Sequence, residues 1–272
     1  TCAPCQTARS DMEFGTMAGI GGIFVAVIVS MVLEGSSPMA ILLLPALFLV
    51  FVGTFGAAMA GGLVRDLPTV VRHAKKALVG KPLDGQQTVE TIVAMADRAR
   101  RQGLLALEEM IKDVEDPLLR QGIELTVDGT DPEQIEDILE ARIAAKRADD
   151  KVGVKFFGDM GGYAPTLGII GTVIGLIHVL GNLSSPEQLG HLIAGAFVAT
   201  LWGVLSANAL WLPLSNKLKR MSEFEVAQME LVVEGVLAVQ SGTNPRLVEQ
   251  KLRSSLPAVG GKGEAGVAAE AA

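Results

Sequence analysis

Two threonines and two prolines stand in apolar stretches where polar groups are rare. Thr172 and Pro165 lie in YAPTLGIIGTVIGLIHVLG, and Thr200 and Pro213 lie in FVATLWGVLSANALWLPL. Each proline deprives an upstream carbonyl of its helical hydrogen-bond donor. Hydroxyl and carbonyl oxygens can coordinate a partly dehydrated cation or a file of water molecules. A single membrane threonine more often bonds its own helix backbone, so it is the four residues together that indicate an ion pathway.

These stretches contain no carboxylate, which limits what they can do alone. Asp159 and Glu187 stand only at their edges, and a threonine hydroxyl does not exchange a proton at neutral pH. His178 and His191 lie near the outer ends of the stretches, where a hydrogen-bonded interfacial histidine is the expected role. Asn208 is expected to hydrogen-bond between helices. A conducting channel would therefore need an acidic residue from another polypeptide.

Four apolar runs are long enough to cross a membrane, since a spanning helix needs about 20 mostly apolar residues. They are 14–33, 39–63, 157–180 and 189–212. The links EGSSP and GNLSSPEQ are short and rich in turn residues, which predicts two antiparallel helical hairpins. Pro45 would interrupt the second run, where neighbouring helices can satisfy the freed carbonyl. The polar middle block has helical periodicity that breaks at Gly103, and a further helix is expected to begin at Pro132.

Basic residues are segregated along the chain, and their positions predict its orientation. Both short links lack basic residues. The second run is followed by Arg65, Arg72, Lys75 and Lys76, and the fourth run is followed by Lys217, Lys219 and Arg220. By the positive-inside rule, the middle block and both termini are cytoplasmic. The net charge of −7 argues against a nucleic-acid-binding protein, which usually carries a basic stripe.

The sequence thus predicts an all-α integral membrane protein, with four transmembrane helices in two hairpins and a helical cytoplasmic domain. The expected segments are a disordered N-terminal extension (1–11), the first hairpin (12–63), the cytoplasmic domain (64–156), the second hairpin (157–213), an amphipathic helix (214–242) and a partly disordered tail (243–272). Cys2 and Cys5 lie in the extension, which we interpret as residues upstream of a natural start near Met12, without redox or metal function. Small residues recur at every fourth position in all four runs, which allows close helix packing and favours an oligomer.

The chain resembles flagellar stator A subunits, the MotA/PomA family of the MotA/TolQ/ExbB proton channel superfamily. The resemblance runs from about Met12 to Val239 and is carried by APTLGIIGTVIGLIHVLG, FVATLWGVLSANALWLPL, RRQGLLALEE and VDGTDPEQIEDILE, in the family's order and spacing. It implies a multi-pass protein of the bacterial inner membrane, surrounded by lipid, that forms a pentamer around a dimer of a MotB/PomB-like B subunit. That B subunit would supply the channel aspartate, and ion flow would drive rotation against the rotor switch protein FliG.

The resemblance also assigns roles to individual residues. Pro165, Pro213, Thr172 and Thr200 match the family's ion-pathway positions, and the two threonines are possible Na⁺ ligands. The family's rotor-facing positions are matched by Arg100, Arg101, Glu108 and Glu109. Without the resemblance, these four residues would be interpreted as a solvated helix face. No cofactor is implied, and the transported cation is H⁺ or Na⁺.

A few residues and the number of spans bear on the transported ion and on the alternative functions. Thr172 is typical of sodium-type stators, whereas Ala199 and His178 are typical of proton types, and the balance favours protons. ExbB/TolQ energy-transducing subunits are the alternative, but they have three spans and a periplasmic N-terminus. A secondary transporter would need its own charged or broken-helix site in repeated halves, which this sequence lacks. An enzyme is disfavoured because no nucleophile, metal cluster or phosphate-binding loop is visible.

Overall fold

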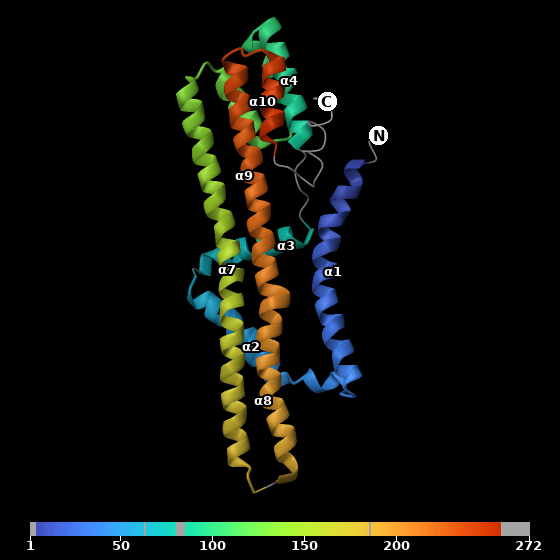
Figure 1. Ribbon diagram of the computed structural model, residues 1–272. Coiled ribbons are helices and arrows are strands. Elements are labelled where there is room, and N and C mark those ends of the chain that lie inside the picture. The colour runs from blue at the N-terminus through green and yellow to red at the C-terminus, as the bar shows by residue number, and fades with distance from the viewer. Residues whose placement is uncertain (1–3, 63, 80–84, 185, 257–272) are drawn as a thin grey trace. The chain divides into compact units, whose positions relative to one another are not determined.

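The computed structural model describes residues 4–62, 64–79, 85–184 and 186–256, and the regular elements within these ranges are all helical (Figure 1). The chain separates into two compact units. The first unit comprises residues 1–81 and 150–219, and the second comprises residues 82–149 and 220–272. The expected all-α fold is confirmed.

The first unit opens with helix α1 (Pro4–Leu33), the 3₁₀ turn η1 (Pro38–Ile41), helix α2 (Leu44–Ala60), the 3₁₀ turn η2 (Val64–Asp66) and helix α3 (Leu67–Val79). Residues 4–11, expected to be disordered, instead form the first turns of α1, because extending an existing helix avoids the cost of nucleation. Residues 1–3, with Cys2, lie outside the described residues. The second span begins at Leu44, so Pro45 lies in its first turn, where no helical hydrogen bond is lost.

The remaining long helices are α7 (Pro132–Gly181), α8 (Pro186–Ser206) and α9 (Leu212–Gln240), with a π-helical segment η4 (Ala207–Trp211) between the last two. Helix α7 is 50 residues long and begins at Pro132, as expected. The expected boundary between the cytoplasmic domain and the third span therefore falls inside one continuous helix. Within the described residues, two helices are long and apolar enough to cross a membrane: α7, and the continuous run of α8, η4 and α9. Met17–Leu33 and Leu44–Ala60 are shorter apolar helices.

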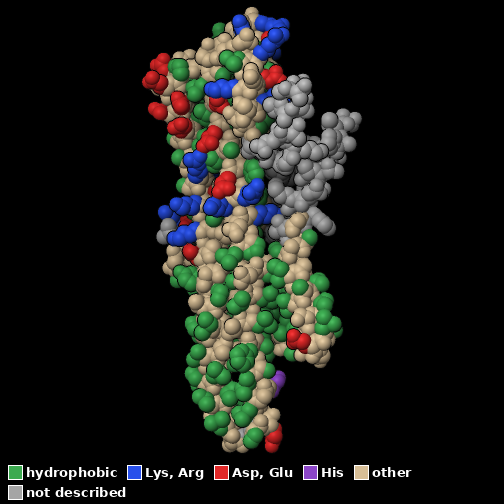
Figure 2. Space-filling view, viewed as in Figure 1, with side chains coloured by type: hydrophobic (Ala, Val, Ile, Leu, Met, Phe, Trp, Pro, Cys, Tyr) green, Lys and Arg blue, Asp and Glu red, His purple; other side chains and the backbone are tan. Residues whose placement is uncertain are grey.

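Much of the apolar surface of the first unit is exposed. The exposed side chains on α7 include Ile169, Ile170, Val173, Ile174 and Ile177. Figure 2 shows hydrophobic side chains gathered over the region that Figure 1 labels α8 and the neighbouring part of α7. Inside the unit, the Trp202 indole N–H donates to the Ile41 carbonyl at 2.7 Å, which fastens α8 to η1. Exposed apolar side chains of this kind are what a lipid environment favours.

The second unit contains helix α4 (Gly85–Gln102), the 3₁₀ turn η3 (Leu104–Leu107), helix α5 (Glu108–Ile111), helix α6 (Pro117–Val127) and helix α10 (Pro245–Ser255), together with parts of α7 and α9. Its core includes Ile92, Leu107 and Val236, each with no exposed surface. A Cβ atom on Gly122 would lie 2.8 Å from Val236 Cγ2, so α6 and α9 approach closely there. This unit has the conventional buried apolar core of a soluble domain.

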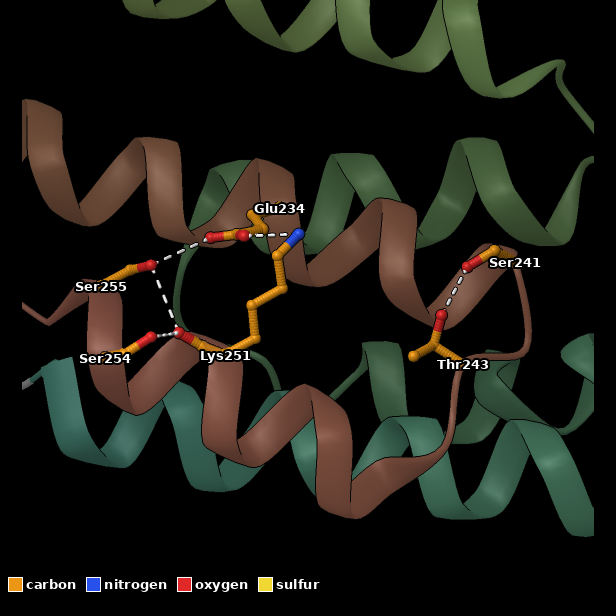
Figure 3. Close-up of polar contacts among 6 residues, drawn as sticks. All are labelled: Glu234, Ser241, Thr243, Lys251, Ser254 and Ser255. Carbon is orange, nitrogen blue, oxygen red and sulfur yellow. Dashed lines mark hydrogen bonds and ion pairs between the residues drawn. The ribbon is translucent and has the colours of Figure 1, made fainter.

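Helix α10 lies in the first part of the tail, where no helix was predicted. The Asn244 side chain caps it by accepting from the Arg246 N–H, and Val248 and Leu252 are buried in the core of the second unit. Lys251 forms an ion pair with Glu234 of α9 at 2.6 Å (Figure 3). A short sequence with only two core residues gave too weak a periodic signal to be recognised. The end of the tail (257–272) lies outside the described residues.

Candidate functional site

Helices α7 and α8 pack so closely at Gly168 and Gly203 that no side chain fits between their backbones at these two positions. A Cβ atom on Gly203 would lie 2.6 Å from the Ala164 carbonyl oxygen, and one on Gly168 would lie 2.9 Å from the Ala199 carbonyl oxygen. The small residues of these two helices therefore serve packing within the chain. Gly22 of α1, by contrast, has nothing within 4 Å of an added Cβ atom.

The close packing brings the two expected channel threonines together. The hydroxyls of Thr172 on α7 and Thr200 on α8 form a hydrogen bond with each other. The Thr172 hydroxyl also lies 3.2 Å from the carbonyl oxygens of Gly168 and Ala196, and the Thr200 hydroxyl lies 3.3 Å from the Gly168 oxygen. Two hydroxyls and two carbonyls from both helices thus form one oxygen cluster.

The oxygen cluster can bind a polar species but carries no charge of its own. A hydroxyl rotates freely and offers two lone pairs, so both threonines can turn an acceptor toward a cation or a water molecule. Thr172 and Thr200 are half-buried, which limits the water that can reach them. The sequence has no Asp or Glu in 160–182 or in 188–216. The cluster can therefore coordinate a cation but cannot balance its charge.

Pro165 lies inside α7 without ending the helix. A proline leaves the carbonyl four residues earlier, here that of Gly161, without its helical donor. Gly161 is buried, and a Cβ atom on it would lie 2.4 Å from Leu212 Cδ2. Because Leu212 directly precedes Pro213, the two proline-altered regions pack against each other.

Pro213 is preceded by a feature that sequence reasoning missed. Residues Ala207–Trp211 form a π-helical turn, in which the Leu212 N–H bonds to the Ala207 carbonyl, five residues earlier. The wider turn relieves the collision between the proline ring and the carbonyl of Ala209 that a regular α-helix would impose. Such turns are frequent at functional sites. Pro213 itself was the available signal, because a proline inside a long helical pattern requires a local change of register.

One polar residue of the spans differs from expectation, and the role of a second stays a prediction. The Asn208 side chain is exposed and donates to the Val204 carbonyl of its own helix at 2.8 Å, so it does not join two helices. A backbone carbonyl one turn earlier in the same helix is always within reach of an asparagine side chain, whereas a hydrogen-bond partner on another helix is not. The His178 side chain is exposed and, within the described residues, its imidazole has no hydrogen-bond partner. The backbone carbonyl of His178 accepts a hydrogen bond from the Asn182 side-chain amide at 2.8 Å.

The second unit places the expected rotor-facing arginines at the end of α4. Arg100 and Arg101 lie in its last turn and are both exposed. Gly103 then turns the chain with a φ of +86°, a conformation that favours glycine. Arg101 is paired with Asp97 one turn earlier at 3.0 Å, whereas Arg100 has no ion pair among the described residues.

The two expected glutamates begin α5, directly after this turn. Glu109 forms an ion pair with Arg98, and Glu108 is exposed with no ion pair within the described part of the chain. Between the arginines and the glutamates, Leu105 is 72% exposed, while Leu107 is completely buried. Leu107 therefore fixes η3 to the core and holds Leu105 outward, at the centre of a charged surface.

Comparison with known proteins gives matches over most of the chain. Residues 110–231 match the MotA/TolQ/ExbB proton channel family. The chain is 41% identical to motility protein A of Bacillus subtilis (strain 168) over 254 residues, which cover 91% of this chain and 92% of that protein. It is 33% identical to the chemotaxis protein PomA of Vibrio alginolyticus over 245 residues, 90% of this chain and 96% of that protein.

Two solved structures have the same fold. One is the flagellar MotAB stator complex from Bacillus subtilis, which is 40% identical, with a TM-score of 0.82. The other is C. jejuni MotAB, which is 28% identical, with a TM-score of 0.86. Each similarity covers 90% of this chain and 96% of the chain in the solved structure.

Proposed function

Because the chain belongs to the motility protein A family of flagellar stator subunits, we propose that its ion pathway passes the oxygen cluster of Thr172 and Thr200. As a member of this family, the chain is an ion-conducting subunit of a flagellar stator, within a family of channel proteins rather than of enzymes. The observation that carries the pathway proposal is the direct contact of the two hydroxyls across α7 and α8. No other pair of hydroxyls from these two helices meets in this way within the described residues.

A second polypeptide completes this pathway. The oxygen cluster lacks a charge-balancing group, and the related solved structures are of MotAB complexes. We assign the missing carboxylate to a MotB/PomB-like B subunit. The transported ion is H⁺ or Na⁺, and Ala199 together with His178 favours H⁺.

The exposed apolar surface of the first unit supports a multi-pass subunit that assembles with further copies of itself in lipid. On α1, for example, Val25, Val29 and Leu33 are exposed, and Gly22 has open space around it. A pentamer in the inner membrane accounts for this exposed surface. Basic residues follow α2 and the first turn of α9, which supports a cytoplasmic location for both termini and for residues 64–156.

The charged turn between α4 and α5 is proposed to contact the rotor protein FliG. Arg100 and Glu108 have no ion pair in the described structure, so they are available to a partner, whereas Arg101 and Glu109 are engaged within the chain. Exposed charges at a rim speed and orient an encounter, and an apolar side chain such as Leu105 can occupy its centre. This combination suits a contact that forms and breaks repeatedly.

Reconstitution tests the function. We expect liposomes that contain this chain alone to show no selective cation current, and liposomes that also contain the B subunit to conduct. Replacing the B subunit's channel acid by its amide should return the current to the level of the chain alone. A selective current from the chain without a partner would contradict the proposal.

Thr172→Val should lower ion conduction about tenfold, because it removes one hydroxyl from the cluster and keeps the side-chain shape. Thr172→Ser keeps the hydroxyl and should retain most of the current. The measurement is the swimming speed and the current of the reconstituted complex, in sodium-containing and sodium-free media. Full conduction by Thr172→Val together with loss in Thr172→Ser would show that the methyl group, rather than the hydroxyl, is needed.

Arg100→Glu should reduce torque severely while Arg100→Lys should reduce it slightly, since the contact depends on the sign of the charge. Arg101→Gln is the matched control, because Arg101 is already paired with Asp97 and should tolerate neutralisation. The measurement is the rotation speed of tethered cells. A charge-reversed residue on FliG should partly restore the rotation of Arg100→Glu, and the absence of any such rescue would count against this surface.

A further inference from the structure

A cavity of about 290 Å³ opens beside the end of α2, in the first unit. Its wall comes from α2 and the glycines that follow it, from η2 and α3, and from one face of α7. The apolar part of the wall includes Ala58, Met59, Leu67, Val70, Val152 and Phe156, and the charged part consists of Asp66, Lys155 and Asp159. We propose that this cavity binds the phosphoethanolamine headgroup of a membrane phospholipid.

The cavity is separate from the ion pathway. Its α7 residues, such as Lys155 and Asp159, lie on one face of the helix. Thr172 is 13 positions beyond Asp159, which at 3.6 residues per turn turns it about 140° away around the helix axis. The two sites therefore face different directions, and the acidic residues of the cavity are not a continuation of the oxygen cluster.

The three charged residues of the cavity have no hydrogen bond or ion pair among the described residues. Asp66 and Asp159 are both half-buried, whereas Lys155 is exposed. Partial burial removes some of the water around the two carboxylates, so a ligand that donates hydrogen bonds to them would be stabilised. Lys155 and Asp159 are one helical turn apart on α7, a spacing that allows an ion pair, yet they do not form one. The two carboxylates and the lysine are therefore available to a ligand with charges of both signs.

Phosphoethanolamine has the matching chemistry. Its primary ammonium group has three N–H donors and can serve both carboxylates, while its phosphate can accept from the Lys155 ammonium. A choline headgroup has no N–H donor for Asp66 and Asp159. Anionic headgroups such as phosphatidylglycerol meet two carboxylates and one lysine, so the net charge repels them. The apolar wall can contact the glycerol and the first methylenes of the acyl chains.

The position of the cavity agrees with such a ligand. Helix α2 ends at Ala60, and Gly61 and Gly62 at the cavity wall follow it directly. In the proposed orientation this is the cytoplasmic end of the span, where the headgroups of the inner leaflet lie. The inference rests on that orientation and on the membrane location of the chain, but it does not depend on torque or on ion conduction.

Lipid binding can be measured directly on the purified complex of this chain with its B subunit. Delipidated complex is mixed with phosphatidylethanolamine, phosphatidylcholine or phosphatidylglycerol of identical acyl chains, and bound lipid is counted by native mass spectrometry. We expect phosphatidylethanolamine to bind about tenfold more tightly than the other two, because only it satisfies both carboxylates and the lysine. Soluble glycerophosphoethanolamine should not compete at equal concentration, since it lacks the acyl chains.

Variants identify the site. Asp66→Asn and Asp159→Asn should each remove most of the preference for ethanolamine over choline, and Lys155→Gln should weaken the binding of all phosphate-containing lipids. The matched controls are Lys151→Gln, one turn before Lys155 and outside the cavity, and Glu187→Gln at the start of α8. Both controls should bind phosphatidylethanolamine as the parent does.

Three results would overturn the assignment. Equal binding of the three lipids would show that the headgroup is not recognised, and unchanged preference in both Asp variants would place the lipid elsewhere. Competition by glycerophosphoethanolamine at equal concentration would assign the cavity to a soluble ligand. If the complex bound the lipid as expected but conducted no ions, the proposed function would fail and the lipid site would stand.

Discussion

Gly203→Ala should abolish swimming and lower the thermal stability of the stator complex. The new methyl group would lie 2.6 Å from the Ala164 carbonyl oxygen and 3.0 Å from the Gly168 Cα atom. Both are backbone atoms of α7, so no side chain can rotate away, and the two helices must separate. Overpacking of this kind costs about 1–3 kcal/mol. Separation would also pull apart Thr172 and Thr200, whose hydroxyls need the close approach.

Gly190→Ala is the matched control on the same helix. An added Cβ atom at Gly190 meets nothing within 4 Å, and alanine is the better helix former, so swimming and stability should be unchanged or slightly higher. The measurements are spreading in soft agar and the unfolding temperature of the detergent-solubilised complex. Normal swimming of Gly203→Ala would mean that α7 and α8 are not tightly packed in the working channel.

Pro213→Ala should stop motor rotation while the protein still inserts into the membrane. Alanine restores the N–H and removes the ring, so the π-helical turn at Ala207–Trp211 can relax to a regular α-helix. A π-helical turn takes up one more residue than an α-helical turn, so its relaxation would rotate the chain on one side by about 100° relative to the other. The contact of Leu212 with Gly161 would then be lost, and the path past Pro165 would change its lining.

Pro186→Ala separates this effect from the general loss of a proline. Pro186 is the first residue of α8, where its missing N–H would be unpaired in any case, so the variant should rotate normally. Rotation of tethered cells is measured, and immunoblots of membrane fractions confirm insertion. Full rotation of Pro213→Ala would show that the wide turn has no part in the motor.

Hydropathy and charge were enough to predict the all-α fold, because the apolar runs are long enough to span a membrane and a helix satisfies all its backbone hydrogen bonds in lipid. They could not show where one helix ends and another begins. The third span is part of α7, and the second span starts at Leu44 rather than at residue 39. Helix α10 was missed because its burial depends on α4 and α9, which are distant in the sequence.

The residue types of the site were predictable, but their contacts were not. Thr172 and Thr200 were recognised as polar groups in apolar helices, yet their hydrogen bond depends on the register between α7 and α8. The contact between Gly161 and Leu212 is likewise a matter of register. Asn208 was assigned to another helix, but its own backbone was nearer.

The neutrality of the oxygen cluster has a kinetic consequence. Hydroxyls and carbonyls without a fixed charge hold a cation weakly, so its residence between α7 and α8 is brief and its release is fast. One elementary charge that crosses about 100 mV yields roughly 2.3 kcal/mol, and a deep binding well would consume that energy as a barrier to escape. In the proposed pathway, the acid of the B subunit would then set the rate of turnover, and the oxygen cluster of this chain would be a shallow binding site.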